Sequence, residues 1–243
     1  MLSVVQTTEA GEGPAGAESH GPAMVRAGYD AIGIRYHEWS HRSPTRLGFL
    51  DEVLRRLAPG STVVDLGCGP GDPATRMLAE HHTVLGVDLS MEQLRIARRL
   101  APGALLVQAD LVDFSLSAGS VDAVVSFYAL GHVPPQDHRP LLRRAAAWLR
   151  PGGLFLTSAP RTPGAGVEEG WLGVPMFFGG IGRDATLTAV TDAGLTLESA
   201  REVEEEEGNG RTVGFLWVTA TKPIHPAAIP AVPPAAGPHG ARG

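Results

Sequence analysis

Hydrophobic positions recur along the chain with two different periods, which predict alternating strands and helices. Short runs of β-branched and apolar residues, such as Thr62–Leu66, are typical of strands buried in a sheet. Between these runs, apolar residues return every three or four positions, as in the stripe of Val25, Tyr29, Ile32 and Tyr36. Strands are predicted at 62–66, 83–88, 105–110, 121–128, 154–158, 195–207 and 213–219, and helices at 25–39, 47–57, 90–100, 137–149 and 184–193.

The order of these elements predicts an α/β fold with a Rossmann-like, doubly wound sheet of about seven strands. The last two strands flank Gly208-Asn209-Gly210, a signal for a hairpin turn, so the sheet is expected to end in an antiparallel β-hairpin. A nicotinamide dehydrogenase domain would instead have a parallel sixth strand at this point. The strand order therefore disfavours a dehydrogenase.

One domain is predicted over residues 23–222, between two tails. Residues 1–22 and 223–243 are rich in small residues or proline and lack apolar periodicity, so we expect both tails to be disordered. Within the domain, residues 160–183 hold several glycines and an apolar cluster. A long loop with aromatic residues is usually functional, so we expect this loop to cap an acceptor site.

The first strand runs into the turn Gly67-Cys68-Gly69-Pro70-Gly71, followed by Asp72 and Pro73. Asp72 is expected to cap the next helix, with Pro73 in its first turn. A dinucleotide-binding turn would have its third glycine where Asp72 stands, and a carboxylate there repels a pyrophosphate. The turn therefore favours a cofactor without phosphate, and S-adenosylmethionine (SAM) fits that description.

Acidic residues end the first three predicted strands. Asp65 is placed to meet the ammonium or sulfonium end of such a cofactor, and Asp88 to accept both ribose hydroxyls. Asp110 is placed to accept from the adenine amino group, with Leu111 against the ring. Cys68, inside the turn, is expected to be a small residue that fits rather than a nucleophile.

These motifs resemble the SAM-binding motifs of class I SAM-dependent methyltransferases, in particular the small-molecule enzymes of types 11 and 25. The resemblance extends over about residues 25–222 and implies transfer of a methyl group to an O or N atom of a small, lipophilic or natural-product-like acceptor. It also implies that the helix at 24–42 is a lid over the cofactor. The cofactor-binding residues implied are Asp65, Gly67, Cys68, Gly69, Asp88, Leu89, Gln93, Ala109, Asp110, Leu111 and Phe127.

Candidate catalytic residues are His132, Tyr29 and Tyr36. His132 follows the fourth strand, and an ordinary pKa of about 6.5 suits a general base; the alternative is that it only shapes the cofactor pocket. Tyr29 and Tyr36 would orient the acceptor from the lid, unless their stripe simply faces the core. In the 160–183 loop, three apolar residues are expected to line the acceptor pocket, unless the loop buries its own aromatic residues. They are Trp171, Met176 and Phe177.

Composition narrows the class of protein further. A net charge of −6 argues against nucleic acid as a partner, and Ser126-Phe127-Tyr128-Ala129 replaces the Asn/Asp-Pro-Pro-Tyr/Phe loop of base-methylating enzymes. The single cysteine excludes an internal disulfide, and no apolar run is long enough for a membrane span, so we expect a soluble cytoplasmic enzyme. The sequence has no cluster of carboxylates after the fourth strand that would hold Mg²⁺, so no metal is expected. The acidic run Glu204–Glu207 is expected to be a solvated strand edge that discourages aggregation.

A second function stays open at this stage. Some proteins of this fold use SAM as a cofactor that is not consumed, in a cyclisation or rearrangement of the substrate. Intact cofactor motifs do not separate that chemistry from methyl transfer. The oligomeric state is also left open.

Overall fold

The computed structural model describes residues 20–41, 43–206 and 211–224. Its main sheet has seven strands in the order β3-β2-β1-β4-β5-β9-β8. The first five strands in that order are parallel, and β9 pairs antiparallel with both β5 and β8. The strands are β1 (Thr62–Leu66), β2 (Thr83–Asp88), β3 (Leu105–Gln108), β4 (Val121–Ser126), β5 (Leu149–Pro160), β8 (Thr196–Glu206) and β9 (Thr212–Thr221).

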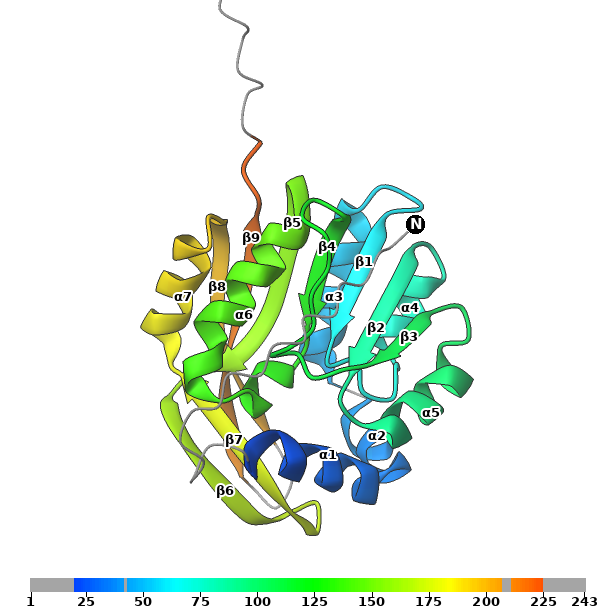
Figure 1. Cartoon of the computed structure of the whole chain (residues 1–243), viewed down its shortest axis with the longest axis vertical. Helices are drawn as coiled ribbons and strands as arrows, with labels where there is room; N and C mark the ends of the chain where they lie inside the picture. The colour runs from blue at the N-terminus through cyan, green and yellow to red at the C-terminus, as the bar shows by residue number, and fades with distance from the viewer. Residues whose placement is uncertain (1–19, 42, 207–210, 225–243) are drawn as a thin grey trace, which may run out of the picture.

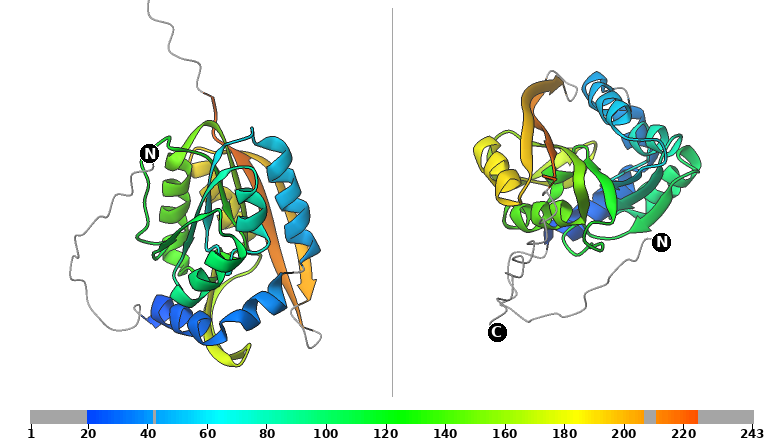
Figure 2. Two further views of the ribbon diagram at one scale, coloured as in Figure 1. Left: turned by 90° about the vertical axis from the view of Figure 1, so that its right-hand side faces the viewer. Right: turned by 90° about the horizontal axis from the view of Figure 1, so that it is seen from above.

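Helices cover both faces of this sheet (Figures 1 and 2). Alternate strand residues face opposite sides, so Val63 packs in a core with α3 and α4, while Val64 packs in a second core with α6 and α7. Burial on both faces explains why the central strands are apolar at nearly every position. The helices are α3 (Pro44–Arg56), α4 (Ala74–Ala79), α5 (Met91–Leu100), α6 (Pro135–Trp148) and α7 (Arg183–Asp192).

The carboxyl ends of the parallel strands are covered by elements outside the sheet (Figure 1). Two helices, α1 (His20–Ile32) and α2 (Ile34–Ser40), lie there, separated at Gly33, whose φ of +56° suits glycine. Beside them lies a two-stranded antiparallel sheet of β6 (Pro163–Trp171) and β7 (Val174–Ile181). A short 3₁₀ helix, η1 (Ala129–His132), follows β4.

The predicted doubly wound sheet of seven strands with a terminal hairpin is confirmed. The prediction of a loop over 160–183 is wrong, since most of that segment is the β6–β7 hairpin. The expected single lid helix is two helices, and the first begins at His20, inside the predicted tail. Residues 1–19 and 225–243 of the predicted tails and the turn at 208–210 lie outside the described residues. Over the described ranges, no helix has the length and apolar character that a membrane span requires.

Candidate functional site

The turn after β1 is built on glycines with left-handed backbone conformations. Gly67 and Gly69 have φ values of +71° and +54°. A Cβ on Gly67 would lie 2.2 Å from the Cβ of Ala129, so only glycine lets the turn approach η1 this closely. The backbone amides of Gly67 and Cys68 both donate to the carbonyl of Val87, which joins this turn to the end of β2.

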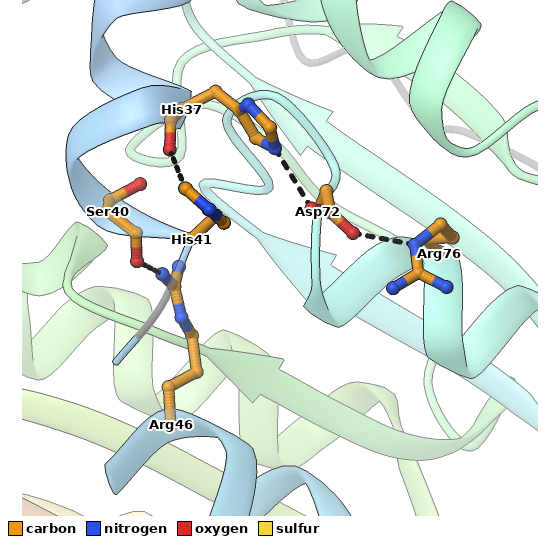
Figure 3. A network of polar contacts seen from close by, with 6 residues as sticks. All are labelled: His37, Ser40, His41, Arg46, Asp72 and Arg76. Atoms are coloured by element: carbon orange, nitrogen blue, oxygen red, sulfur yellow. Dashed lines mark hydrogen bonds and ion pairs between the residues drawn. The ribbon is translucent and has the colours of Figure 1, made fainter. Parts of the chain in front are cut away.

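The predicted capping role of Asp72 is wrong, because its side chain makes no cap to α4. Instead, His37 Nε2 on α2 donates to Asp72 Oδ2 at 2.9 Å, and Arg76 Nε donates to Oδ1 at 2.6 Å (Figure 3). Burial raises the pKa of Asp72, but these two hydrogen bonds outweigh it and hold the pKa below its usual value. Arg46 of α3 also donates to the carbonyl of Ser40, so α2 is held from two directions.

A small cavity of about 70 Å³ lies between the glycine turn and α1. Four of the residues predicted to bind the cofactor line it, namely Gly67, Gly69, Asp88 and Asp110. Asp88 accepts from the backbone amides of Gly69 at 2.7 Å and Ser90 at 2.9 Å, which aims its carboxylate at this space. Burial raises the pKa of Asp88 to about 6 and also raises that of Asp110.

Seven further predicted cofactor residues divide into two sets. Leu89, Leu111 and Phe127 line the small cavity. The other four do not: Asp65, Cys68, Gln93 and Ala109 are absent from its wall.

Three of these four have another place in the structure. Asp65 is buried and accepts from Thr75 Oγ1 at 2.7 Å, and burial raises its pKa to about 6. The amide of Gln93 donates to the carbonyls of Tyr29 and Gly33, so Gln93 positions α1 and α2 rather than facing the cavity. Burial raises the pKa of Cys68 well above its usual value, in keeping with the expectation that this thiol is not a nucleophile.

A larger cavity of about 810 Å³ lies beside the first, between α2, the β6–β7 hairpin and the β8–β9 hairpin. Trp171 lines it as predicted, but the other two acceptor-pocket residues do not. Met176 is fully buried against Gly28 of α1, and the ring of Phe177 lies over Gly21. Because neighbouring strand residues face opposite sides, Phe178 lines the cavity and Phe177 does not, while Met176, on the same face as Phe178, is covered by α1.

The two cavities share a wall made of Tyr29, Tyr36, Tyr128 and His132. The hydroxyl of Tyr29 lies 2.8 Å from Nε2 of His132, and Nδ1 of His132 lies 2.9 Å from the carbonyl oxygen of Phe177. A carbonyl only accepts, so Nδ1 carries a proton. Burial lowers the pKa of His132 to about 4, so the ring is neutral near pH 7 and Nε2 accepts from the Tyr29 hydroxyl.

Sequence reasoning missed the hydrogen-bonded pair of Tyr128 and Glu205 in the larger cavity. Tyr128 adopts a left-handed conformation at φ +65° directly after β4, and its hydroxyl donates to Glu205 at 2.8 Å. The acidic run lies on β8 at the edge of the sheet, and Glu204 and Glu206 are exposed as expected, whereas Glu205 is half-buried and faces Tyr128 in the cavity. The only available signal for Tyr128 was its position at the carboxyl end of a parallel strand, where ligands bind.

Comparison with known proteins agrees with this geometry. Residues 63–153 match the family model described as methyltransferase domain. The chain is 41% identical over 108 residues to trans-aconitate 2-methyltransferase of Azoarcus sp., covering 43% of this chain and 41% of that protein. It is 36% identical over 127 residues to ubiquinone biosynthesis O-methyltransferase of Xanthomonas campestris, covering 48% and 51%. The chain thus spans about half the length, or less, of these curated relatives.

Solved structures share the fold over a larger part of the chain. The 1,6-didemethyltoxoflavin-N1-methyltransferase of Burkholderia thailandensis, solved with S-adenosylhomocysteine, has a TM-score of 0.64 at 19% identity, over 92% of this chain and 96% of that one. The [4+2]-cyclase SpnF has a TM-score of 0.58 at 19% identity, over 73% and 82%. Residues 63–153 thus match a methyltransferase domain, and the fold of the chain is that of the class I SAM-dependent methyltransferases.

Proposed function

We propose that this protein transfers a methyl group from SAM to an oxygen or nitrogen atom of a small-molecule acceptor. The observation that carries the proposal is the shared wall of Tyr29, Tyr36, Tyr128 and His132 between two cavities at the carboxyl ends of the parallel strands. A methyl donor in the small cavity and an acceptor in the large one would meet at this wall. Proximity and alignment at such a junction supply much of the catalysis that methyl transfer needs.

The residues of the small cavity fit SAM. Asp88 would accept from the ribose hydroxyls, the backbone of Gly67 and Gly69 would lie against the methionine part, and Asp110 with Leu111 would hold the adenine. When bound, SAM supplies an electrophilic methyl group on a sulfonium. A cavity of about 70 Å³ is smaller than the ~300 Å³ of an ordinary ligand pocket, so α1 must move for the cofactor to enter.

Tyr29 and His132 would handle the proton that the acceptor loses. Because Nε2 of His132 accepts from the Tyr29 hydroxyl, this histidine is already in the tautomer that a general base requires. An acceptor hydroxyl or amine at the shared wall would pass its proton to Tyr29 Oη as the tyrosine proton moves to Nε2. Tyr36, whose ring meets that of Tyr29 edge-on at 5.0 Å, would keep Tyr29 in place.

The nature of the acceptor is suggested by the walls of the larger cavity. Trp39, Trp171, Phe178 and Phe215 contribute aromatic surface there, which favours a lipophilic small molecule. The relatives named above act on both oxygen and nitrogen acceptors, so the methylated atom is left as O or N. The alternative of a cyclisation with SAM unconsumed keeps the same site, and accumulation of S-adenosylhomocysteine with turnover separates the two.

The first test is a calorimetric titration with SAM and S-adenosylhomocysteine. We expect micromolar binding to the wild type and a loss of about tenfold or more in Asp88→Asn, since a carboxylate–hydroxyl pair is lost. Asp113→Asn is the matched control, because Asp113 is exposed and lies outside the cavity wall. Absence of binding by the wild type, or equal binding by Asp88→Asn, would contradict the proposal.

A further inference from the structure

The larger cavity contains one carboxylate held by hydroxyl groups. Glu205 on β8 accepts from the Tyr128 hydroxyl at 2.8 Å to each of its two oxygens, and Ser43 Oγ lies 3.4 Å from Oε2. Tyr128 and Ser43 also line the cavity and are hydrogen-bonded to each other at 2.9 Å. These contacts fix the position of the carboxylate without neutralising its charge.

The charge of Glu205 is not balanced by an ion pair in the part of the chain that the structure describes. Its neighbour Glu204 pairs with Arg161, and Glu168 across the cavity pairs with Arg211 at 2.5 Å. Arg46 lies over the ring of Tyr128, 5.4 Å from its centroid, but donates to the carbonyl of Ser40. No ion pair within 4.0 Å links Glu205 to a described lysine, arginine or histidine.

The full charges on the cavity wall are mostly negative. Three neighbouring glutamates of β8 and Glu168 contribute carboxylates, while Arg211 is the cation among the lining residues. His132, the other titratable base on this wall, is neutral near pH 7 because burial lowers its pKa. A cation inside this space is therefore favoured over an anion.

Aromatic rings surround the same space. Trp39 and Trp171 meet edge-on at 5.8 Å between centroids, and Tyr36 lies 6.1 Å from Trp171. Faces of such rings attract ammonium groups, and the attraction is larger where water is excluded. A fixed carboxylate in a cavity lined by aromatic rings is an arrangement that recognises a protonated amine.

We propose that the acceptor carries a protonated amine, or another organic cation, that binds the carboxylate of Glu205 inside the aromatic cavity. This inference rests on the proposed function, because it names the class of acceptor for the same site. It assigns Glu205 as a specificity-determining residue, with Tyr128 as the residue that positions it. Tyr128 lines both cavities and is hydrogen-bonded to Glu205, so a cation bound by Glu205 would lie next to the shared wall.

The test uses the full-length protein with S-adenosylhomocysteine and three probes on one indole skeleton. Tryptamine is cationic, tryptophol is neutral and indole-3-acetate is anionic, so calorimetric titrations of the three isolate the effect of charge. We expect tryptamine to bind about tenfold or more tightly than tryptophol, and indole-3-acetate to bind most weakly. Glu205→Gln should remove this preference, since glutamine keeps an oxygen for the Tyr128 hydroxyl but has no charge.

Glu202→Gln is the matched control. Glu202 lies on the same strand, pairs with Arg161 and Arg183, and does not line the cavity, so the preference for tryptamine should persist in this variant. Tryptamine that binds no better than tryptophol, including no detectable binding of either, would overturn the inference, as would an unchanged preference in Glu205→Gln. Titration of the same samples with S-adenosylhomocysteine tests the cofactor site separately, so a failure there counts against the proposed function and not against the cation site.

Discussion

His37 Nε2, on α2, lies 2.9 Å from Oδ2 of Asp72, in the turn that follows β1. The two side chains are about four-fifths buried, with 19% and 17% of their surface exposed. This contact joins an element outside the sheet to the segment that would hold the cofactor. The contact therefore holds α2, and with it the end of α1 that precedes Gly33, beside the small cavity.

The first prediction concerns this contact. His37→Ala should increase hydrogen–deuterium exchange over residues 20–41 and weaken binding of S-adenosylhomocysteine about three- to tenfold, since a partly buried charged hydrogen bond contributes about 1 kcal/mol. Arg95→Ala is the control, because Arg95 is 66% exposed and pairs with Glu92 on the surface of α5. Unchanged exchange in His37→Ala would show that α2 is held by other contacts.

A second prediction concerns Tyr29 and His132. If they move the acceptor proton, Tyr29→Phe and His132→Gln should each lower kcat by about 10²- to 10⁴-fold with little change in KM. Since burial lowers the pKa of His132 to about 4, the base stays neutral down to that pH. The rate of S-adenosylhomocysteine formation should then be flat from about pH 8 to 5 and fall only toward pH 4. An inflection near pH 6.5 would contradict this assignment.

Asp65 allows a prediction about stability and pH. Burial raises the pKa of Asp65 from 3.8 to about 6. Between pH 3.8 and 6, the folded state therefore keeps a proton on Asp65 that the unfolded state has already released. Stability from this group is therefore present below about pH 4 and is lost as the pH rises through 6. Asp65→Asn should be more stable than the wild type at pH 7, by up to about 3 kcal/mol, and by little at pH 4. Urea unfolding at the two pH values measures this, and an equal effect at both would contradict it.

Two residues on the same face of β7, Met176 and Phe178, give a paired prediction. Met176→Ala should cost about 2–5 kcal/mol of unfolding free energy, because Met176 is fully buried against α1. Phe178→Ala should cost less and instead raise the KM of the acceptor, because Phe178 lines the larger cavity. Urea unfolding and steady-state kinetics of both variants would test which of the two is covered by α1 and which lines the cavity. The reverse pattern would place Phe178 in the core and Met176 at the acceptor.

The fold could be predicted from the sequence because its signals are local. The apolar run of β1, Asp65 and the glycines of the turn all fall within residues 62–71, and Asp88 ends the next strand along the chain. Asp88 and Gly69, which both line the small cavity, could be brought together at the carboxyl ends of the strands for the same reason.

The acceptor side was predicted less well because it depends on register and on long-range packing. A loop assignment for 160–183 does not predict which side chains point to the same side. In a strand, an error of one position turns the cavity-facing residue from Phe178 into Phe177. Asp65 lies in the core, where the hydroxyl of Thr75, ten positions later, donates a hydrogen bond to its carboxylate. Glu205 meets Tyr128 only through the folded sheet, 77 residues apart in sequence.

The wall of Tyr29, Tyr36, Tyr128 and His132 belongs to both cavities, and this has a thermodynamic consequence. A ligand that orders these four side chains in one cavity changes the free energy of binding in the other. Linkage makes that change reciprocal: the factor by which S-adenosylhomocysteine tightens the binding of an acceptor equals the factor by which the acceptor tightens the binding of S-adenosylhomocysteine. Two titrations in opposite order should therefore return one coupling free energy, and its size measures how far this wall acts as a single unit.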